Sequence, residues 1–126
     1  MCRFFLPCFF FLAFCFSINA QTVDHWETAV YNNDNWFYTL GASEPPSNWN
    51  TIAFNDASWD QGAGGIGYGD EDDNTIIGSA LSLYMRRSFQ LTQVSKIEHV
   101  ILHADYDDAF VAYLNGVEIG RRFIGA

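Results

Sequence analysis

The stretch FVAYLNGVEI, residues 110–119, decides the fold class of this chain. Residues 110–114 and 117–119 are rich in aromatic and β-branched side chains, which are typical of β-strands. Asn115 and Gly116 stand between them and favour the positive φ angles of a type I′ turn. The stretch therefore predicts two antiparallel strands joined by a tight β-hairpin turn.

Alternation of side chains with period two extends this prediction to the rest of the chain. Residues 83–91 and 100–104 both alternate in this way, as half-buried strands do. Residues 24–31 and 36–40 are further candidate strands, and patterns with a helical period are weak throughout. The sequence thus predicts an all-β domain.

Turn-forming residues separate these candidate strands. Residues 43–48 contain two prolines, which cannot donate hydrogen bonds to a sheet, so we expect a loop there. Residues 55–58 predict a turn, residues 62–69 a glycine-rich loop and residues 70–74 an acidic loop. Many short strands between glycine and proline turns favour a β-sandwich or jelly roll.

The glycine run at residues 62–67 matches the dinucleotide-binding fingerprint by its letters. That fingerprint needs a helix after the glycines, so that the helix N-terminus can hold the pyrophosphate. Here the acidic residues 70–73 follow, and their carboxylates would repel a phosphate. We therefore favour a tight turn or bulge over nucleotide binding.

Residues 1–20 are typical of a cleavable export signal. Arg3 gives a charged start, residues 4–16 form an apolar run, and Ala20 is a small residue at the expected cut. A membrane-spanning helix needs ~20 apolar residues, so this run of 13 is too short for one. We expect a mature chain that begins at about Gln21, is secreted or held at the cell surface, and has no membrane segment after cleavage.

Composition limits what the mature residues 21–126 can do. All three cysteines, Cys2, Cys8 and Cys15, lie in the export signal, so the mature chain must be held by its core or by a metal. Cleavage removes one of the six basic residues and leaves five against 15 acidic ones, a net charge of −10. Such a surface disfavours nucleic acid and anionic lipid, and it suits neutral sugars, cations or solubility alone.

An ordered series of motifs runs through the mature chain. Its members are Asn48-Trp49, Phe54–Gly62, Ile66–Asp70, Thr75-Ile76, Leu83–Phe89 and Tyr106–Ile119. This series resembles the galactose-binding-like jelly-roll domain of large secreted bacterial proteins, which often also carry a CotH-type kinase domain, a lamin-tail domain or a sorting signal. Its later half is similar to the sugar-binding domain of family-two glycoside hydrolases.

The resemblance spans about residues 26–123 and implies a galactose-binding-like jelly-roll sandwich. The family pattern continues with a final pair of strands that is absent here. We therefore expect residues 21–126 to be the N-terminal part of one β-sandwich domain, truncated at its C-terminal strands, with further domains downstream in the same chain.

Two acidic clusters are candidate calcium sites. Their members are Asp70, Asp72 and Asn74 in the first cluster, and Asp105, Asp107 and Asp108 in the second. Crowded carboxylates repel one another unless a cation neutralises them, and calcium takes oxygen ligands of this kind. The first cluster departs from the helix–loop–helix calcium motif at Thr75 and Leu81. The alternative is a solvated loop, or an arginine partner such as Arg86 or Arg87.

Aromatic residues supply the other candidate site. A sugar ring stacks on an exposed aromatic face, and Tyr68, Tyr106 and Trp49 each stand in or beside a predicted loop. We expect at least three of the four tryptophans to belong to the core. His99 and His103 are separated by four residues, or ~13 Å on a strand, so they are not expected to share a metal.

These observations favour a non-catalytic accessory domain of a secreted multidomain protein that binds carbohydrate or a glycan surface. No nucleophile elbow, zinc-protease helix or catalytic triad series is present in the sequence, so we expect no enzyme activity in this part of the chain. Two alternatives stay open. One is a structural module that positions a downstream enzyme or adhesion domain, and the other is the sugar-binding lobe of a glycosidase.

Overall fold

The computed structural model of this chain describes residues 23–69 and 71–124. Within those ranges the elements are strands and one 3₁₀ turn, so the all-β prediction is confirmed. The strands are β1 (Asn35–Leu40), β2 (Asp60–Ala63), β3 (Ile66–Gly67), β4 (Thr75–Ile76), β5 (Leu83–Arg86), β6 (Phe110–Leu114) and β7 (Val117–Arg122), and the turn η1 is Val94–Lys96. The predicted export signal, its cleavage point and Asp70 lie outside the described residues.

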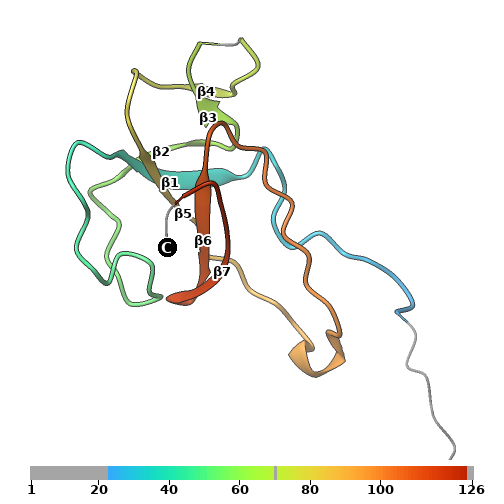
Figure 1. Ribbon diagram of the computed structural model, residues 1–126. Helices are drawn as coiled ribbons and strands as arrows, with labels where there is room; N and C mark the ends of the chain where they lie inside the picture. Colours follow the sequence, from blue (N-terminus) through green and yellow to red (C-terminus); the bar gives the residue numbers. More distant parts are fainter. Residues whose placement is uncertain (1–22, 70, 125–126) are drawn as a thin grey trace, which may run out of the picture.

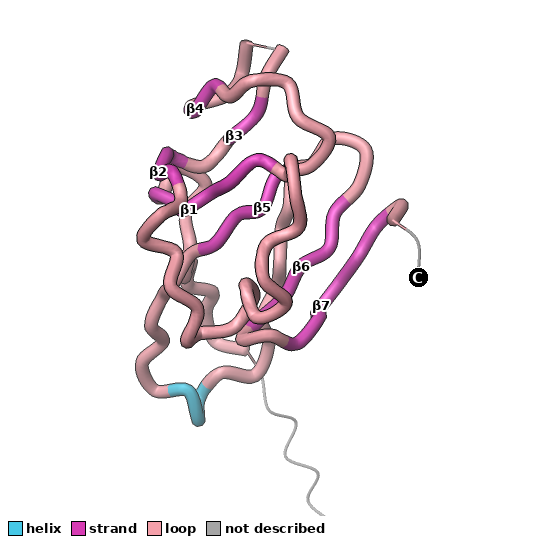
Figure 2. The backbone as a smooth tube through the Cα atoms, turned by 90° about the vertical axis from the view of Figure 1, so that its left-hand side faces the viewer, coloured by secondary structure: helices cyan, strands magenta, loops and turns pink. Residues whose placement is uncertain are grey.

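The strands form three small sheets (Figure 1). β1 lies between β2 and β5 and pairs antiparallel with both, so that Phe37 stands opposite Gln61 on one side and Arg86 on the other. β3 and β4 form a short parallel pair. β6 and β7 form an antiparallel hairpin, which lies beside the first sheet in the view of Figure 2.

The hairpin at residues 110–122 confirms the strongest sequence prediction. Asn115 and Gly116 have φ angles of 52° and 85°, both positive as a type I′ turn requires. Opposite β6, the register moves from Glu118 directly to Gly120, which leaves Ile119 as a β-bulge. Because the bulge shifts the alternation by one residue, Glu118 and Arg121 lie on the same face of the hairpin and form an ion pair.

Three predicted strands are absent or shortened. Residues 24–31 and 100–104 form no strand, and the strand expected over residues 83–91 ends at Arg86. Residues 88–108 are exposed throughout and run as a long excursion that carries η1 (Figure 1). An extended segment becomes a strand only when a neighbour satisfies its backbone hydrogen bonds, and no described strand pairs with residues 100–104.

The predicted glycine-rich loop is a strand–turn–strand unit in tight contact with its neighbours. A Cβ placed on Gly64 would lie 2.1 Å from the Asn32 carbonyl oxygen, and one on Gly62 would lie 2.5 Å from Thr75 Oγ1. Only glycine permits such approaches. The Asn74 amide donates to the Gly64 carbonyl at 2.7 Å, and β4 follows this turn without a helix. The arrangement agrees with the tight turn that we favoured over a nucleotide-binding loop.

The core is a cluster of half-buried aromatic rings centred on Trp49. Its ring lies 6.3 Å from Trp59, 5.1 Å from Tyr84 and 5.8 Å from Tyr113, measured between centroids. These partners come from the 48–59 loop, from β5 and from β6, so the cluster joins the first sheet to the hairpin. No hydrophobic side chain in residues 23–69 and 71–124 is fully buried. Three of the four tryptophans are half-buried, whereas Trp26 is exposed.

Candidate functional site

Tyr68 follows β3 and presents its ring to solvent. Half of the residue, 50%, is exposed, and Gly67 and Gly69 flank it. Gly69 has a φ of 103°, a left-handed conformation that glycine adopts without strain. A Cβ on Gly67 would lie 2.4 Å from Asp73 Oδ1, so the Asp73 carboxylate sits directly over Gly67. The Asp73 carboxylate, a hydrogen-bond acceptor, therefore lies over the residue that precedes Tyr68.

The other two aromatic candidates are engaged in packing. Tyr106 is 39% exposed and meets Phe110 edge to face, with 4.6 Å between the ring centroids. Trp49 is the centre of the aromatic cluster, with three rings against it. Among the described residues, Tyr68 makes no such aromatic contact. Of the three residues, Tyr68 thus has the ring that is most available to a ligand.

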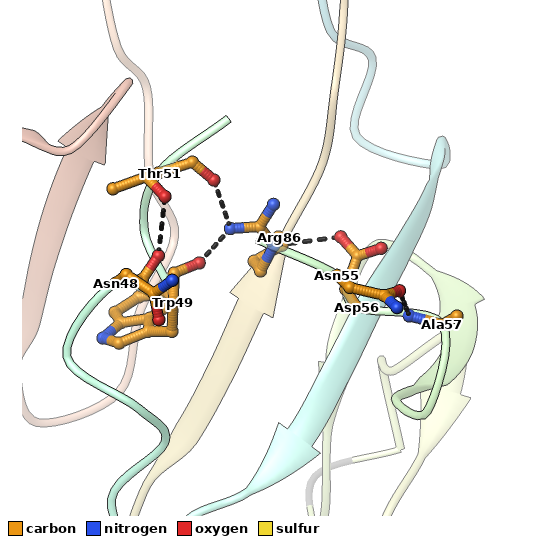
Figure 3. A network of polar contacts seen from close by, with 7 residues as sticks. All are labelled: Asn48, Trp49, Thr51, Asn55, Asp56, Ala57 and Arg86. Carbon is orange, nitrogen blue, oxygen red and sulfur yellow. Dashed lines mark hydrogen bonds and ion pairs between the residues drawn. The ribbon is translucent and has the colours of Figure 1, made fainter. Parts of the chain in front are cut away.

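A polar network around Arg86 fixes the loop that carries Trp49 (Figure 3). Arg86 Nε donates to Asp56 Oδ2 at 2.9 Å, and Nη1 donates to the carbonyls of Thr51, at 3.0 Å, and of Trp49. The Arg86 side chain is only 10% exposed, and its guanidinium carbon lies 5.0 Å from the centre of the Phe54 ring. These contacts give Arg86 a structural role in holding residues 49–56 against β5.

The same loop confirms the predicted turn at residues 55–58. The backbone N–H of Ala57 donates to Asn55 Oδ1 at 3.1 Å, and the N–H of Trp59 donates to the Asp56 carbonyl at 2.9 Å. Asparagine side chains favour such turns because they hydrogen-bond to the backbone two residues later. The turn places the Asp56 carboxylate toward Arg86 in Figure 3.

Arg87 anchors the start of β1 in a similar way. Its Nη2 lies 2.9 Å from Asp34 Oδ2, and its Nη1 donates to the Asn35 carbonyl at 2.5 Å. Arg86 is thus paired with Asp56, and Arg87 with Asp34. Neither of these aspartates belongs to the two acidic clusters for which the arginines were candidate partners. This structural use of the arginines was missed in the sequence, although two charges at the end of an otherwise apolar strand were a signal for it.

The acidic clusters do not converge on one point among the described residues. Asp72 is exposed, and the Asn74 amide is used in its bond to Gly64. Asp105, Asp107 and Asp108 are exposed in the turn before β6. In residues 23–69 and 71–124, no three acidic or histidine side chains are placed to hold one metal ion. Since Asp70 is not described, calcium binding stays a prediction.

In the described N-terminal segment, the imidazole of His25 lies between two carboxylates. His25 Nδ1 lies 2.7 Å from Asp24 Oδ1, and Nε2 lies 3.1 Å from Glu27 Oε1. Hydrogen bonds to these two carboxylates raise the pKa of His25, and the bond to His25 lowers the pKa of Asp24. His99 and His103 lie exposed in the segment that forms no strand.

Comparison with known proteins adds no relative: no protein-family model, no curated protein and no solved structure matches the chain. The described residues contain no helix with the length and apolar character needed to cross a bilayer. Function must therefore be inferred from the chemistry of the exposed side chains, among which Tyr68, with the Asp73 carboxylate over the preceding glycine, is the leading candidate site.

Proposed function

We propose that this chain is a non-catalytic accessory domain of a secreted protein and that it binds a neutral carbohydrate on Tyr68. The observation that carries the proposal is the half-exposed Tyr68 between two glycines, one of which, Gly67, has the Asp73 carboxylate over it. The resemblance to galactose-binding-like jelly rolls supports the same class of ligand. The acidic composition also supports it, because it disfavours anionic partners.

The chemistry of such a site follows from the two faces of a sugar. The apolar C–H face of a pyranose covers an aromatic ring, while its hydroxyl groups donate hydrogen bonds to carboxylate and carbonyl oxygens. Tyr68 supplies the ring, and Asp73, which lies over the adjacent Gly67, supplies acceptors. Glycine at position 69 has nothing within 4 Å of its Cβ position, so the backbone on that side of Tyr68 is open.

Tyr68→Ala tests this proposal directly. We expect the variant to lose binding to the neutral polysaccharide that the unaltered chain retains in affinity electrophoresis, with its unfolding midpoint unchanged because the ring is exposed. Tyr106→Ala, at the ring packed on Phe110, is the matched variant and should keep binding. If the unaltered chain binds no polysaccharide in a broad panel of neutral glucans, mannans, xylans and galactans, the carbohydrate proposal is wrong.

Calcium is the cofactor that we propose for one of the acidic clusters, in a structural role. Ligand binding to the folded state alone raises stability by about 2.7 kcal/mol at a hundredfold excess over the dissociation constant. Millimolar calcium should then raise the melting temperature, with magnesium as the control, because magnesium requires a stricter octahedral site. Asp72→Asn or Asp107→Asn should reduce the shift, according to which cluster binds. An unchanged melting temperature together with no bound metal by elemental analysis would contradict the proposal.

A second function is favoured by a different observation, the uncovered apolar side chains of residues 91–124. They include Leu91, Val94, Val100, Ile101, Leu102, Val117, Ile119 and Phe123. Where exposed apolar side chains gather into a patch, they mark contact with other protein surfaces. A structural module that packs against a neighbouring enzyme or adhesion domain would use this surface and would leave Tyr68 without a ligand. Polysaccharide binding by the unaltered chain, together with its loss in Tyr68→Ala, therefore separates the two functions.

A further inference from the structure

We propose that Tyr31 is a second aromatic platform and that the ligand is an extended polysaccharide chain, not a single sugar; this inference rests on the proposed carbohydrate function. Tyr31 is 58% exposed, slightly more than Tyr68. It begins a short turn in which its N–H donates to Asp34 Oδ2 at 2.8 Å and its carbonyl accepts from the Asp34 N–H at 3.2 Å.

That turn is docked on the glycine unit that leads to Tyr68. The Gly64 N–H donates to the Asp34 carbonyl at 2.9 Å, and the Asn32 carbonyl lies against Gly64. Arg87 holds Asp34 from the other side, at 2.9 Å. The backbone of Tyr31 is thereby placed at the start of the glycine unit, and Tyr68 stands at its end.

The glycine unit connects the 31–34 turn to Tyr68 and has polar side chains against it. Its backbone turns at Gly65, whose φ is 75°, and β3 then leads to Tyr68. The side chains that lie along it are Asn74 at Gly65 and Asp73 at Gly67, both able to accept hydrogen bonds from hydroxyl groups. Two aromatic platforms with polar groups between them suit a ligand with several rings in a row.

The exposure of these two rings is not a consequence of loose packing nearby. The Gly64 and Gly67 contacts, at 2.1 and 2.4 Å from a Cβ position, are among the closest that any glycine of the described chain makes. The uncovered apolar residues between positions 88 and 108 lie instead in a segment that is exposed along its whole length. Tyr31 and Tyr68 are thus exposed residues that lie next to closely packed parts of the backbone.

The test compares Tyr31→Ala with the unaltered chain on two probes, a long neutral polysaccharide and the disaccharide of the same linkage. We expect binding of the long chain to fall at least tenfold, with disaccharide binding at Tyr68 and the melting temperature both unchanged. Tyr31→Phe, which keeps the ring, should bind both probes normally. Phe123→Ala removes an exposed ring on the β6–β7 hairpin and should change neither affinity.

The outcomes separate the two proposals. If Tyr31→Ala binds the long chain as tightly as the unaltered protein while Tyr68→Ala does not, the second platform is wrong and the carbohydrate function stands. If the unaltered chain binds neither probe of any linkage, both proposals fail together. Equal losses on the long chain and the disaccharide would place Tyr31 in the same single-sugar site and would overturn the extended-chain inference.

Discussion

Two regions of the chain differ in whether their hydrophobic side chains are packed against other residues. In the packed region, residues 31–87, the strands are half-buried around aromatic rings and glycine contacts, and polar networks tie its loops down. In the open region, residues 88–108, every residue is exposed, although the stretch is rich in aliphatic side chains. Hydrophobic residues therefore make a core only where partner surfaces exist to receive them.

The largest change in stability is expected when one variant from each region is compared, Trp49→Ala in the packed region and Leu102→Ala in the open region. Trp49 is surrounded by three rings, so its truncation should lower the free energy of unfolding by about 3 kcal/mol, the lower end for an aromatic-to-alanine change. Leu102 is mostly exposed in the open region, and its truncation should change stability by no more than about 0.5 kcal/mol. Urea unfolding of the full chain measures both. Similar losses for the two variants would mean that the open region is packed in solution.

The next test removes an anchoring charge. Arg86→Met leaves the Asp56 carboxylate and the Trp49 and Thr51 carbonyls without their donor, and we expect a loss of about 2 kcal/mol, below the 3–5 kcal/mol for breaking a fully buried pair. Arg121→Met breaks the exposed pair with Glu118 and should have a much smaller effect. Thermal and urea unfolding report both changes. An Arg86 variant as stable as the Arg121 variant would contradict the anchoring role.

A smaller loss of stability is expected when one methyl group is added at Gly64. Gly64→Ala would bring its Cβ to 2.1 Å from the Asn32 carbonyl, so the 31–34 turn must shift, at a cost of about 1–2 kcal/mol. Gly78→Ala is the control, since its Cβ would meet nothing within 4 Å, and a neutral or slightly stabilising change is expected there. If the two alanine variants unfold at the same urea concentration, the contact at Gly64 is not a tight one.

The smallest effect concerns pH and tests whether a local ion pair forms without a packed surface. The pKa of His25 is raised by Asp24 and Glu27, so its contribution to stability is complete below the unfolded-state pKa and is lost as the pH rises through the higher folded-state value. Asp24→Asn combined with Glu27→Gln should lower the pKa of His25, which NMR titration of the imidazole protons measures. An unchanged titration curve would show that the exposed segment does not hold these contacts in solution.

Local chemistry explains which elements could be predicted from sequence. The hairpin at residues 110–119 was predictable because Asn115 and Gly116 encode the turn and the turn itself pairs the strands. Residues 36–40 were predictable because a short run of aromatic and β-branched side chains favours a strand, and this strand has neighbours on both sides. Residues 100–104 alternate with period two but have no paired neighbour, and alternation specifies faces, not partners.

The candidate site was predictable in part for the same reason. Tyr68 could be selected from its place between glycines, a local feature. The packing of Trp49 and the pairing of Arg86 with Asp56 depend on residues about 30 to 60 positions away, so no local pattern could distinguish a ring in the core from a ring at a surface. The short parallel pair β3–β4 was not predicted either, since two-residue strands leave no periodic signal.

The bulge at Ile119 has a consequence for how concentrated solutions of this protein behave. A regular β7 would be a flat ribbon of unpaired amides that could recruit other copies and seed fibrils. The extra residue twists that margin and gathers Glu118 and Arg121 into a charged pair along it, both of which oppose stacking of one copy on another. Deleting Ile119 would restore regular pairing and separate this charged pair, so we expect the variant to aggregate at a lower concentration than the unaltered chain.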